Sequence, residues 1–368
     1  MSDDLHFVDV DVTKTLENMI TVYEAVTERK LYPADPVRLF LLTIAKLLVM
    51  QQVLIDSSKK MDHLRFARGE YLDLLGERYG VKRLEASSAR TTIRFMLSAL
   101  QTSAITIPLG TRVTSGDNVY FTTIEAAEIR KDSMTVDVSV ECVLPGTSGN
   151  GYLPGQLTTL VDPIPFVASV TNLTTTLGGA DTENDDSLRE RIRLSLGSFS
   201  VAGPHDSYVY WAKTASPAII DVAVNSPSVR VVRIVPLLAG GEIPSQDVLD
   251  SVADVLNDRS VRPLTDKVEV AAPVIKKYNI DATFWIHRDN AAEATTIQAA
   301  VQSAVSDYAL WQKSKLGRAM NQSELIRRVM AAGAYRVNVT SPVYAEVGHD
   351  EVAIADAKSI TYGGMVDD

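Results

Sequence analysis

The chain has 368 residues, 46% of them hydrophobic and 22% charged, which is the composition of an ordinary globular protein of two to three domains. Its formal net charge is −10, and this argues against a nucleic-acid partner, because such proteins need a basic surface to neutralise phosphates. A single cysteine, Cys142, excludes an internal disulfide and a multi-cysteine zinc site.

The start of the chain has none of the pattern of an export signal. Met1 to His6 are acidic and polar, whereas a signal peptide has basic residues before an apolar core. With no disulfide framework, the chain is expected to fold in a cytoplasm. The most apolar stretch, 39–55, contains Lys46 and two glutamines, so we interpret it as a helix buried between partners, without membrane insertion.

Three helices are predicted in the first 90 residues. The first has apolar residues at three- and four-residue spacing, which places them on one face: Leu16, Met19, Ile20, Tyr23 and Val26. The second begins at Asp35-Pro36, an N-cap followed by a first-turn proline. The third spans Glu70 to Tyr79 and ends at Gly80, a left-handed C-terminal cap.

The second helix is apolar on more than one face. The residues that spread beyond a single stripe are Leu39, Leu42, Leu47, Val49 and Val53. A helix that is hydrophobic nearly all round must be covered on nearly all sides. Two interpretations remain open, namely the core of a small local domain and a bundle completed by other chains. The scarcity of other helices favours the bundle, so these five residues are the candidate assembly surface.

From residue 91 the pattern changes to short strands. Alternating apolar residues predict strands at 91–97 and 134–140, and dense Gly, Pro, Asn and Asp turns separate the strands. We expect a small antiparallel β domain over 91–178.

Strands and helices alternate after that point. A first α+β unit over 179–272 is predicted to contain helices at 185–196 and 245–256 and strands at 219–225, 229–235 and 267–271. A second over 273–368 contains a strand at 278–287, helices at 291–308 and 323–332, a strand at 335–340, and short strands at 352–354 and 359–362. The fold class is therefore α+β and multidomain, with an N-terminal helical region over 1–90, the β domain, and two α+β units whose helices pack on small sheets.

In the helix at 185–196, Asp185 and Asp186 complement the positive N-terminal end. Its periodicity predicts that Leu188, Ile192 and Leu196 face inward and that the arginines face solvent: Arg189, Arg191 and Arg193. The acidic run before it fails as a calcium loop, because Asp186 stands where glycine is required.

Catalytic motifs are not found in the sequence. The glycine-rich loop 146–155 lacks the Lys-Ser/Thr ending and the following helix of a phosphate-binding loop. His205, Asp206 and Ser207 are adjacent and point in different directions, so they form no relay, and Asp206-Ser207 are better interpreted as a helix cap. The remaining histidines have no metal-ligand spacing. We therefore expect no enzyme activity, no metal and no cofactor.

Several motifs nevertheless resemble one family. They are Leu72-Asp73-Leu74-Leu75-Gly76; Ile107-Pro108-Leu109-Gly110-Thr111; Gly146-Thr147-Ser148-Gly149-Asn150; Gly178-Gly179-Ala180-Asp181-Thr182-Glu183 with Leu188-Arg189-Glu190-Arg191; Arg262-Pro263-Leu264-Thr265; Leu316-Gly317; and Ser323-Glu324-Leu325-Ile326. Over residues 71–362 the chain resembles the baseplate J-like wedge proteins of contractile-tailed phages and phage-tail-like bacteriocins, in the version of Mu-like tails.

The resemblance implies a structural role without catalytic residues. Such proteins form the wedges of the baseplate and link them into a ring around the hub. The partners implied are further copies of the chain, other wedge subunits, and tail hub or sheath-proximal proteins. The implied location is the tail particle, assembled in the bacterial cytoplasm. Two alternatives remain, a polysaccharide-active surface protein and a type VI secretion baseplate component; the low aromatic content, 7%, disfavours the first.

Overall fold

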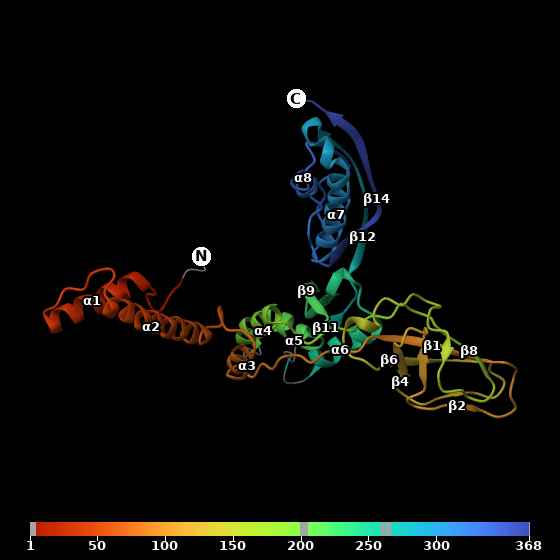
Figure 1. Ribbon diagram of the computed structural model, residues 1–368. Helices are drawn as coiled ribbons and strands as arrows, with labels where there is room; N and C mark the ends of the chain where they lie inside the picture. The colour runs from red at the N-terminus through yellow and green to blue at the C-terminus, as the bar shows by residue number, and fades with distance from the viewer. Residues whose placement is uncertain (1–4, 199–204, 259–260, 262–265, 368) are drawn as a thin grey trace. The chain divides into compact units, whose positions relative to one another are not determined.

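The computed structural model describes residues 5–198, 205–258, 261 and 266–367. It divides into two compact bodies, Met1–Lys82 and Arg83–Asp368, which we call the helical body and the main body. The helical body contains three α-helices among its described residues, and the main body contains the β domain followed by the two α+β units (Figure 1).

The helical body is an α-hairpin with a short third helix. Helix α1 spans Val12–Thr27 with Asp11 as its N-cap, α2 spans Pro36–Met61 with Asp35 as its N-cap, and α3 spans Glu70–Glu77. The Asp35 carboxylate accepts the Val37 amide at 2.9 Å, so the predicted N-cap is confirmed. The contact between α1 and α2 is a small apolar cluster: Leu16, Met19, Ile20, Tyr23, Leu31, Val37 and Leu41. Val26, predicted on the same face, is 79% exposed, because it lies at the margin of this stripe.

Helix α3 ends two residues earlier than predicted, at Glu77, yet the predicted glycine cap is present. Gly80 has φ +70°, its amide donates to Glu77 O at 3.0 Å, and the Val81 amide donates to Gly76 O at 3.0 Å. These are the two hydrogen bonds of a Schellman motif, which satisfies carbonyls that the last turn leaves free.

The β domain is an antiparallel sheet that curls on itself. Its strands are β1 (Arg90–Leu97), β2 (Ile105–Ile107), β3 (Arg112–Thr114), β4 (Tyr120–Thr123), β5 (Ala127–Ile129), β6 (Thr135–Cys142), β7 (Thr159–Leu160) and β8 (Val167–Asn172). Six of them pair in the order β7-β3-β4-β6-β1-β8, and β2 pairs with β5. The end strands β7 and β8 contact each other, so the sheet is nearly closed. The two predicted strands lie side by side as β1 and β6, with Ile93 opposite Val138 inside the core.

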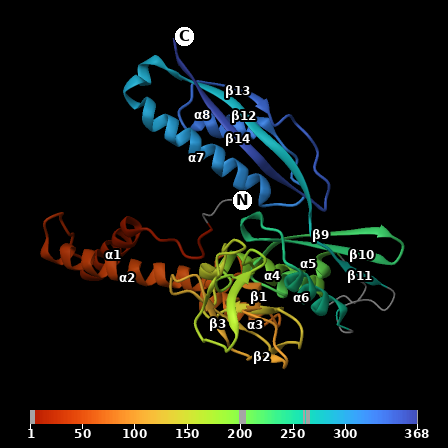
Figure 2. The same ribbon diagram turned by 90° about the vertical axis from the view of Figure 1, so that its right-hand side faces the viewer.

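The first α+β unit packs its helices on a three-stranded sheet. Its elements are α4 (Asp185–Ser198), α5 (His205–Thr214), β9 (Ile219–Ser228), β10 (Val231–Leu238), α6 (Gln246–Asn257) and β11 (Lys267–Val270). The central strand β10 pairs antiparallel with β9 and parallel with β11. Figure 2 shows β9 and β10 as one long hairpin.

The second α+β unit repeats this arrangement with another chain order. It contains β12 (Val274–His287), α7 (Ala294–Lys313), α8 (Gln322–Ala331), β13 (Arg336–Ser341) and β14 (Glu351–Val366), with the helices on one side of the sheet (Figure 1). The central strand β12 pairs antiparallel with β13 and parallel with β14.

The prediction of two short strands at 352–354 and 359–362 is wrong, because both segments are parts of the single strand β14. Between them, Asp356 forms a bulge, where the register along β12 shifts between Tyr278 and Asn279. The bulge and the exposed residues 356–359 interrupt the apolar alternation, while the backbone pairing continues.

Helix α4 corrects two predicted side-chain directions. Leu188 and Ile192 are buried as predicted, but Leu196 is 60% exposed. Arg191, predicted to face solvent, is only 3% exposed because it pairs with Glu183 at 2.6 Å. Arg189 pairs with Asp186 at 2.5 Å, and Asp185 pairs with Arg83 at 2.7 Å.

The two α+β units are packed directly on each other. The Leu316 amide donates to the Asp221 carboxylate at 2.9 Å, and an apolar cluster joins Val235 and Leu237 to Val352. Gly241, with φ +70°, passes so close that a β-carbon there would lie 2.3 Å from Lys313 O. Only glycine fits this crossing, which fixes one unit against the other.

Helix α4 provides a test of which of its faces is buried. Ile192→Ala should destabilise the main body by about 2–5 kcal/mol, because Ile192 is 1% exposed and its loss leaves a cavity. Leu196→Ala, on the same helix, should change stability by about 0.5 kcal/mol or less. Thermal melts of both variants decide this, and equal melting temperatures would contradict the assigned face of the helix.

Candidate assembly surface

One stripe of α2 is covered by its own chain. Leu41, Ala45 and Val49 recur every four residues on this stripe and are buried, and Leu41 belongs to the cluster beneath α1. Residues at this spacing lie above one another on one side of a helix. This stripe accounts for the hairpin and leaves the rest of the helix circumference to be explained.

The remaining circumference of α2 is apolar and exposed. The exposed large apolar residues are Leu39, Phe40, Leu47, Leu48, Met50, Val53, Leu54 and Ile55. Between Leu39 and Ile55 the only charged residue is Lys46. Burying one such side chain fully is worth about 1.5–3 kcal/mol, so a partner that covers several of them gains substantial binding energy.

Three of these exposed residues form a regular stripe. Phe40, Leu47 and Leu54 are seven residues apart, and positions at that spacing drift by only about 20° around a helix. At 100° per residue this stripe lies about opposite the covered stripe. A seven-residue apolar repeat is the pattern with which helices pack side by side.

The structure separates the five predicted surface residues. Leu39, Leu47 and Val53 are exposed, Leu42 is half-buried at the border, and Val49 is 8% exposed on the covered stripe. The prediction missed five exposed residues: Phe40, Leu48, Met50, Leu54 and Ile55. The seven-residue spacing from Phe40 to Leu54 is the sequence signal that identifies the stripe.

Helix α1 extends the apolar surface. A groove of about 470 Å³ lies along α1 and is lined by Asn18, Met19, Val22, Tyr23, Val26 and Leu41. Val22 and Val26 are largely exposed. The helical body therefore presents apolar side chains on both helices of its hairpin.

Among the described residues, α2 is also the one helix long and apolar enough to cross a membrane. Its last two turns, however, contain Asp56, Lys59 and Lys60. A helix buried between protein partners has the same length and composition.

The glycine-rich motifs of the sequence meet at a joint between the β domain and the first α+β unit. The Asn150 side chain donates to Gly179 O at 2.7 Å and accepts the Gly179 amide at 2.9 Å. A β-carbon on Gly179 would lie 2.4 Å from Gly146 O. Ser87 pairs with Ala180 across the same joint. Asn150 and Gly146 of the β domain thus pack closely against Gly179 at the start of the first α+β unit. This packing explains why these residue types occur at these positions.

A buried ion pair completes the joint. The Arg191 guanidinium donates two hydrogen bonds of 2.6 Å to Glu183, and both side chains are 3% exposed. Glu183 also accepts the Leu84 amide at 3.1 Å, and its own amide donates to Leu84 O at 3.0 Å. Arg83 donates to Glu183 O at 2.7 Å. The segment that leads into β1 is thereby fixed to the start of α4.

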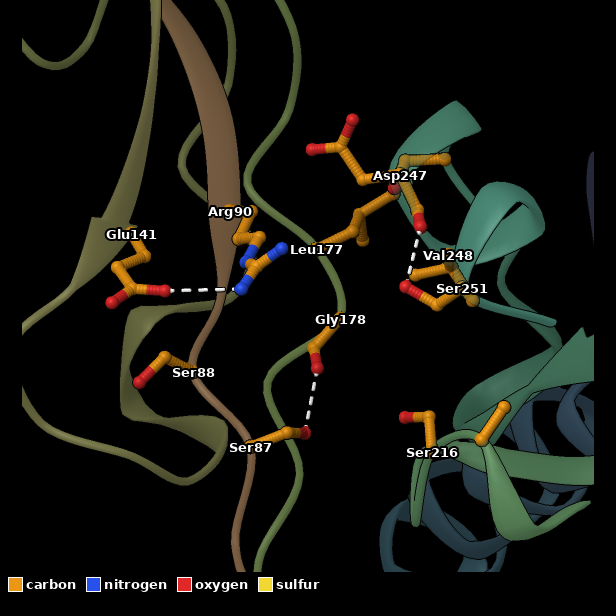
Figure 3. Close-up of a pocket in the computed structure, with 12 residues that line it drawn as sticks. Ser87, Ser88, Arg90, Glu141, Leu177, Gly178, Ser216, Asp247, Val248 and Ser251 are labelled. Carbon is orange, nitrogen blue, oxygen red and sulfur yellow. Dashed lines mark hydrogen bonds and ion pairs between the residues drawn. The ribbon is translucent and has the colours of Figure 1, made fainter. Parts of the chain in front are cut away.

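A pocket of about 260 Å³ lies beside this joint, between the start of β1 and α6 (Figure 3). The Ser87 and Ser251 hydroxyls donate to backbone carbonyls of Gly178 and Asp247 at 2.8 Å, and Arg90 pairs with Glu141 at 3.2 Å. The described residues that line it include neither histidine nor cysteine. The pocket offers hydroxyl, carboxylate and guanidinium groups for hydrogen bonding.

The other candidate chemical groups of the sequence lie in the described part of the chain. It holds no group of three or more His, Cys, Asp or Glu side chains placed to bind a metal ion. His205 lies 3.1 Å from the neighbouring Asp206 carboxylate, while Ser207 is buried in α5. The loop 146–155 contains a 3₁₀ turn at Thr147–Gly149 and no following helix.

The main body is therefore modular: a nearly closed β domain is followed by two α+β units, and hydrogen bonds and apolar contacts connect each part to the next. Three family models match in this order: the baseplate J-like protein barrel domain over residues 92–179, the central domain over 200–272 and the C-terminal domain over 278–362. Together they cover about two thirds of the chain. The chain belongs to the baseplate J-like protein family.

Curated relatives agree with this assignment. Baseplate protein J of Escherichia phage P2 is 32% identical over 162 residues, which are 44% of this chain and 53% of that protein. Baseplate protein gp47 of Escherichia phage Mu is 28% identical over 162 residues, 44% of this chain and 40% of that protein. The matched segments thus span about half the length of these relatives or less.

A solved structure is also similar, the cryo-EM structure of the anti-feeding prophage baseplate, six-fold symmetrised. It covers 93% of this chain and 90% of the matched chain, with 13% identity and a TM-score of 0.41. The family assignment rests on the sequence matches. Of the motifs that carried the resemblance, Arg262-Pro263-Leu264-Thr265 lies outside the described residues.

The buried pair at the joint gives a second test. Glu183→Gln should destabilise the main body by about 3–5 kcal/mol, because it leaves the Arg191 charge buried without its counter-ion. Glu141→Gln, in the exposed pair with Arg90, should cost about 1 kcal/mol or less. Urea unfolding of both variants measures the difference. Equal midpoints would show that the buried pair does not hold the joint.

Proposed function

We propose that this chain is a structural component of a contractile tail baseplate and resides in the tail particle. The observation that carries the proposal is the series of three baseplate J-like domain matches across residues 92–362. The names of the phage P2 and phage Mu relatives support it.

Within the baseplate we propose that the chain forms the wedges and links them into a ring around the hub. Its partners are other baseplate proteins, in particular further copies of itself, other wedge subunits, and tail hub or sheath-proximal proteins, with assembly in the bacterial cytoplasm. The rigid joint at Glu183 and the packed α+β units support a role that needs a fixed shape.

The helical body is the proposed attachment point for these partners. Its α2 surface is apolar around most of the circumference, and exposed apolar patches of this extent mark interaction sites. The seven-residue stripe of Phe40, Leu47 and Leu54 favours helical partners. We also propose that the β domain and the two α+β units are separate domains, with boundaries at 91–178, 179–272 and 273–368.

The proposed role is non-catalytic, without cofactor or nucleic acid. The structural part played by the glycine-rich motifs supports this, since the residues that suggested a phosphate or nucleophile site form the joint. The polysaccharide-active alternative has no observation in its favour. A type VI secretion baseplate component is the same structural class in another machine.

The assembly surface is tested by placing a charge on the exposed stripe. Leu47→Asp should leave the protein folded, because Leu47 is 57% exposed, and should reduce the number of complete tails at least ten-fold. An anchor at the centre of an interface is worth about 2 kcal/mol or more, and a charge buried there adds a desolvation cost. Electron microscopy counts the tails, with circular dichroism as the folding check.

Gln51→Asp is the matched control, because it adds the same charge at an exposed polar position of the same helix. It should support normal tail numbers. Normal numbers from a folded Leu47→Asp protein would refute the assembly surface. Flotation with phospholipid vesicles tests whether α2 inserts into a membrane instead. Membrane insertion predicts that the wild-type chain binds vesicles and that Leu47→Asp does not.

The structural role predicts that the purified chain has no hydrolase activity. Incubation with peptidoglycan or capsular polysaccharide should release no soluble sugar above a buffer blank. The polysaccharide-active alternative would be supported by cleavage that a single carboxylate-to-amide substitution abolishes.

A further inference from the structure

The covered stripe of α2 changes character half-way along the helix. Its first half is apolar, with Leu41, Ala45 and Val49. Its second half continues at three- and four-residue spacing with Gln52, Asp56 and Lys60. Asp56 is only 6% exposed, an unusual place for a carboxylate on an otherwise apolar helix.

The two halves are covered by different kinds of chain. Helix α1 packs on the start of the apolar half, at Leu41. The polar half is covered by residues 5–9, a non-helical segment that precedes α1 and that we call the strap (Figure 1). The Phe7 ring stacks on His63, just beyond α2, with 5.1 Å between ring centroids.

The Asp56 carboxylate is held by three donors and lies beside the His6 ring. It accepts the backbone amides of Phe7 at 2.6 Å and Val8 at 3.3 Å, and it lies 3.3 Å from the His6 ring nitrogen. Lys60, one turn along α2, pairs with it at 2.8 Å. Lys60 together with these donors holds the pKa of the Asp56 carboxyl well below its usual range, so the group is charged at neutral pH.

This requirement for donors discriminates between partners. A non-helical segment has free backbone amides, whereas beyond its first turn a helix has bonded every amide within itself. An apolar helix face laid over Asp56 would bury the Asp56–Lys60 ion pair without replacing the strap donors, and a buried ion pair whose remaining hydrogen bonds are not made is costly.

We propose that Asp56 is a specificity-determining residue of the helical body: it reserves the second half of the covered stripe for the chain's own strap and so directs helical partners to the opposite stripe of Phe40, Leu47 and Leu54. This inference rests on the proposed function in one respect, namely that the opposite stripe is the assembly surface. The strap itself is a feature of the isolated chain and can be measured without any partner.

The test replaces the carboxylate in the full-length chain. Asp56→Leu removes the acceptor and makes the stripe apolar along its whole length. In hydrogen–deuterium exchange, the amides of Phe7 and Val8 should lose protection at least ten-fold. Asp62→Leu is the matched control, because Asp62 is an exposed acid at the end of the same helix, and it should leave the strap protected. Unchanged protection in Asp56→Leu would overturn the assignment of Asp56 as the anchor.

The exclusion of helical partners by Asp56 is measured by native mass spectrometry, which reports how many chains associate. The measurement uses the Leu47→Asp protein, in which the charge blocks association through the opposite stripe. If Leu47→Asp alone does not lower the association of the full-length chain, the assembly surface is wrong, and this is seen before Asp56 is changed. In that background, Asp56→Leu should raise the mass from one chain to two or more. A single-chain mass with a released strap would overturn the selective role.

Removal of residues 1–9 separates the strap from the carboxylate. In the same background the truncated chain should remain a single chain, because the bare carboxylate still rejects an apolar helix. Combining the truncation with Asp56→Leu should restore association. Association from the truncation alone would show that the strap, rather than Asp56, is the barrier.

Discussion

The architecture of the main body depends on the buried pair between Glu183 and Arg191. One carboxylate binds both a guanidinium on α4 and the Leu84 amide in the segment entering the β domain. Such a pair is stable only when its geometry is complete, because each charge has left water. The cap of α4 at Asn184, the crossing at Gly179 and the entry to β1 must therefore form together. If one of these contacts did not form, the buried Glu183 carboxylate would lose part of its hydrogen bonding.

Sequence periodicity predicted the elements whose burial is decided locally. The strands β1 and β6, and the helices α2 and α8, follow from alternation or caps that lie within the element. Arg191 was misassigned because a helical pattern places charges outside unless a buried partner is known, and Glu183 lies before the helix begins. Strand β14 was divided because Asp356 breaks the side-chain alternation, whereas backbone pairing with β12 continues through the bulge.

The sequence predicted that α2 has an apolar surface, but it identified only some of the residues that form this surface. Excess apolarity of α2 is visible in composition, but which of its residues are covered depends on how the helical body packs, and in the structure Val49 is buried while Phe40 is exposed. The strap was not predicted, because nothing local links residues 5–9 to Asp56, about fifty positions away. The glycine motifs identified the family correctly, and their physical role at a chain crossing became visible only in three dimensions.

The close passage of Gly241 under Lys313 has a mechanical consequence. Together with the Asp221 hydrogen bond and the apolar cluster around Val352, it connects the two sheets at one crossing. A rotation of one sheet against the other would have to break this hydrogen bond and expose part of the cluster to water, so these contacts oppose bending at the crossing.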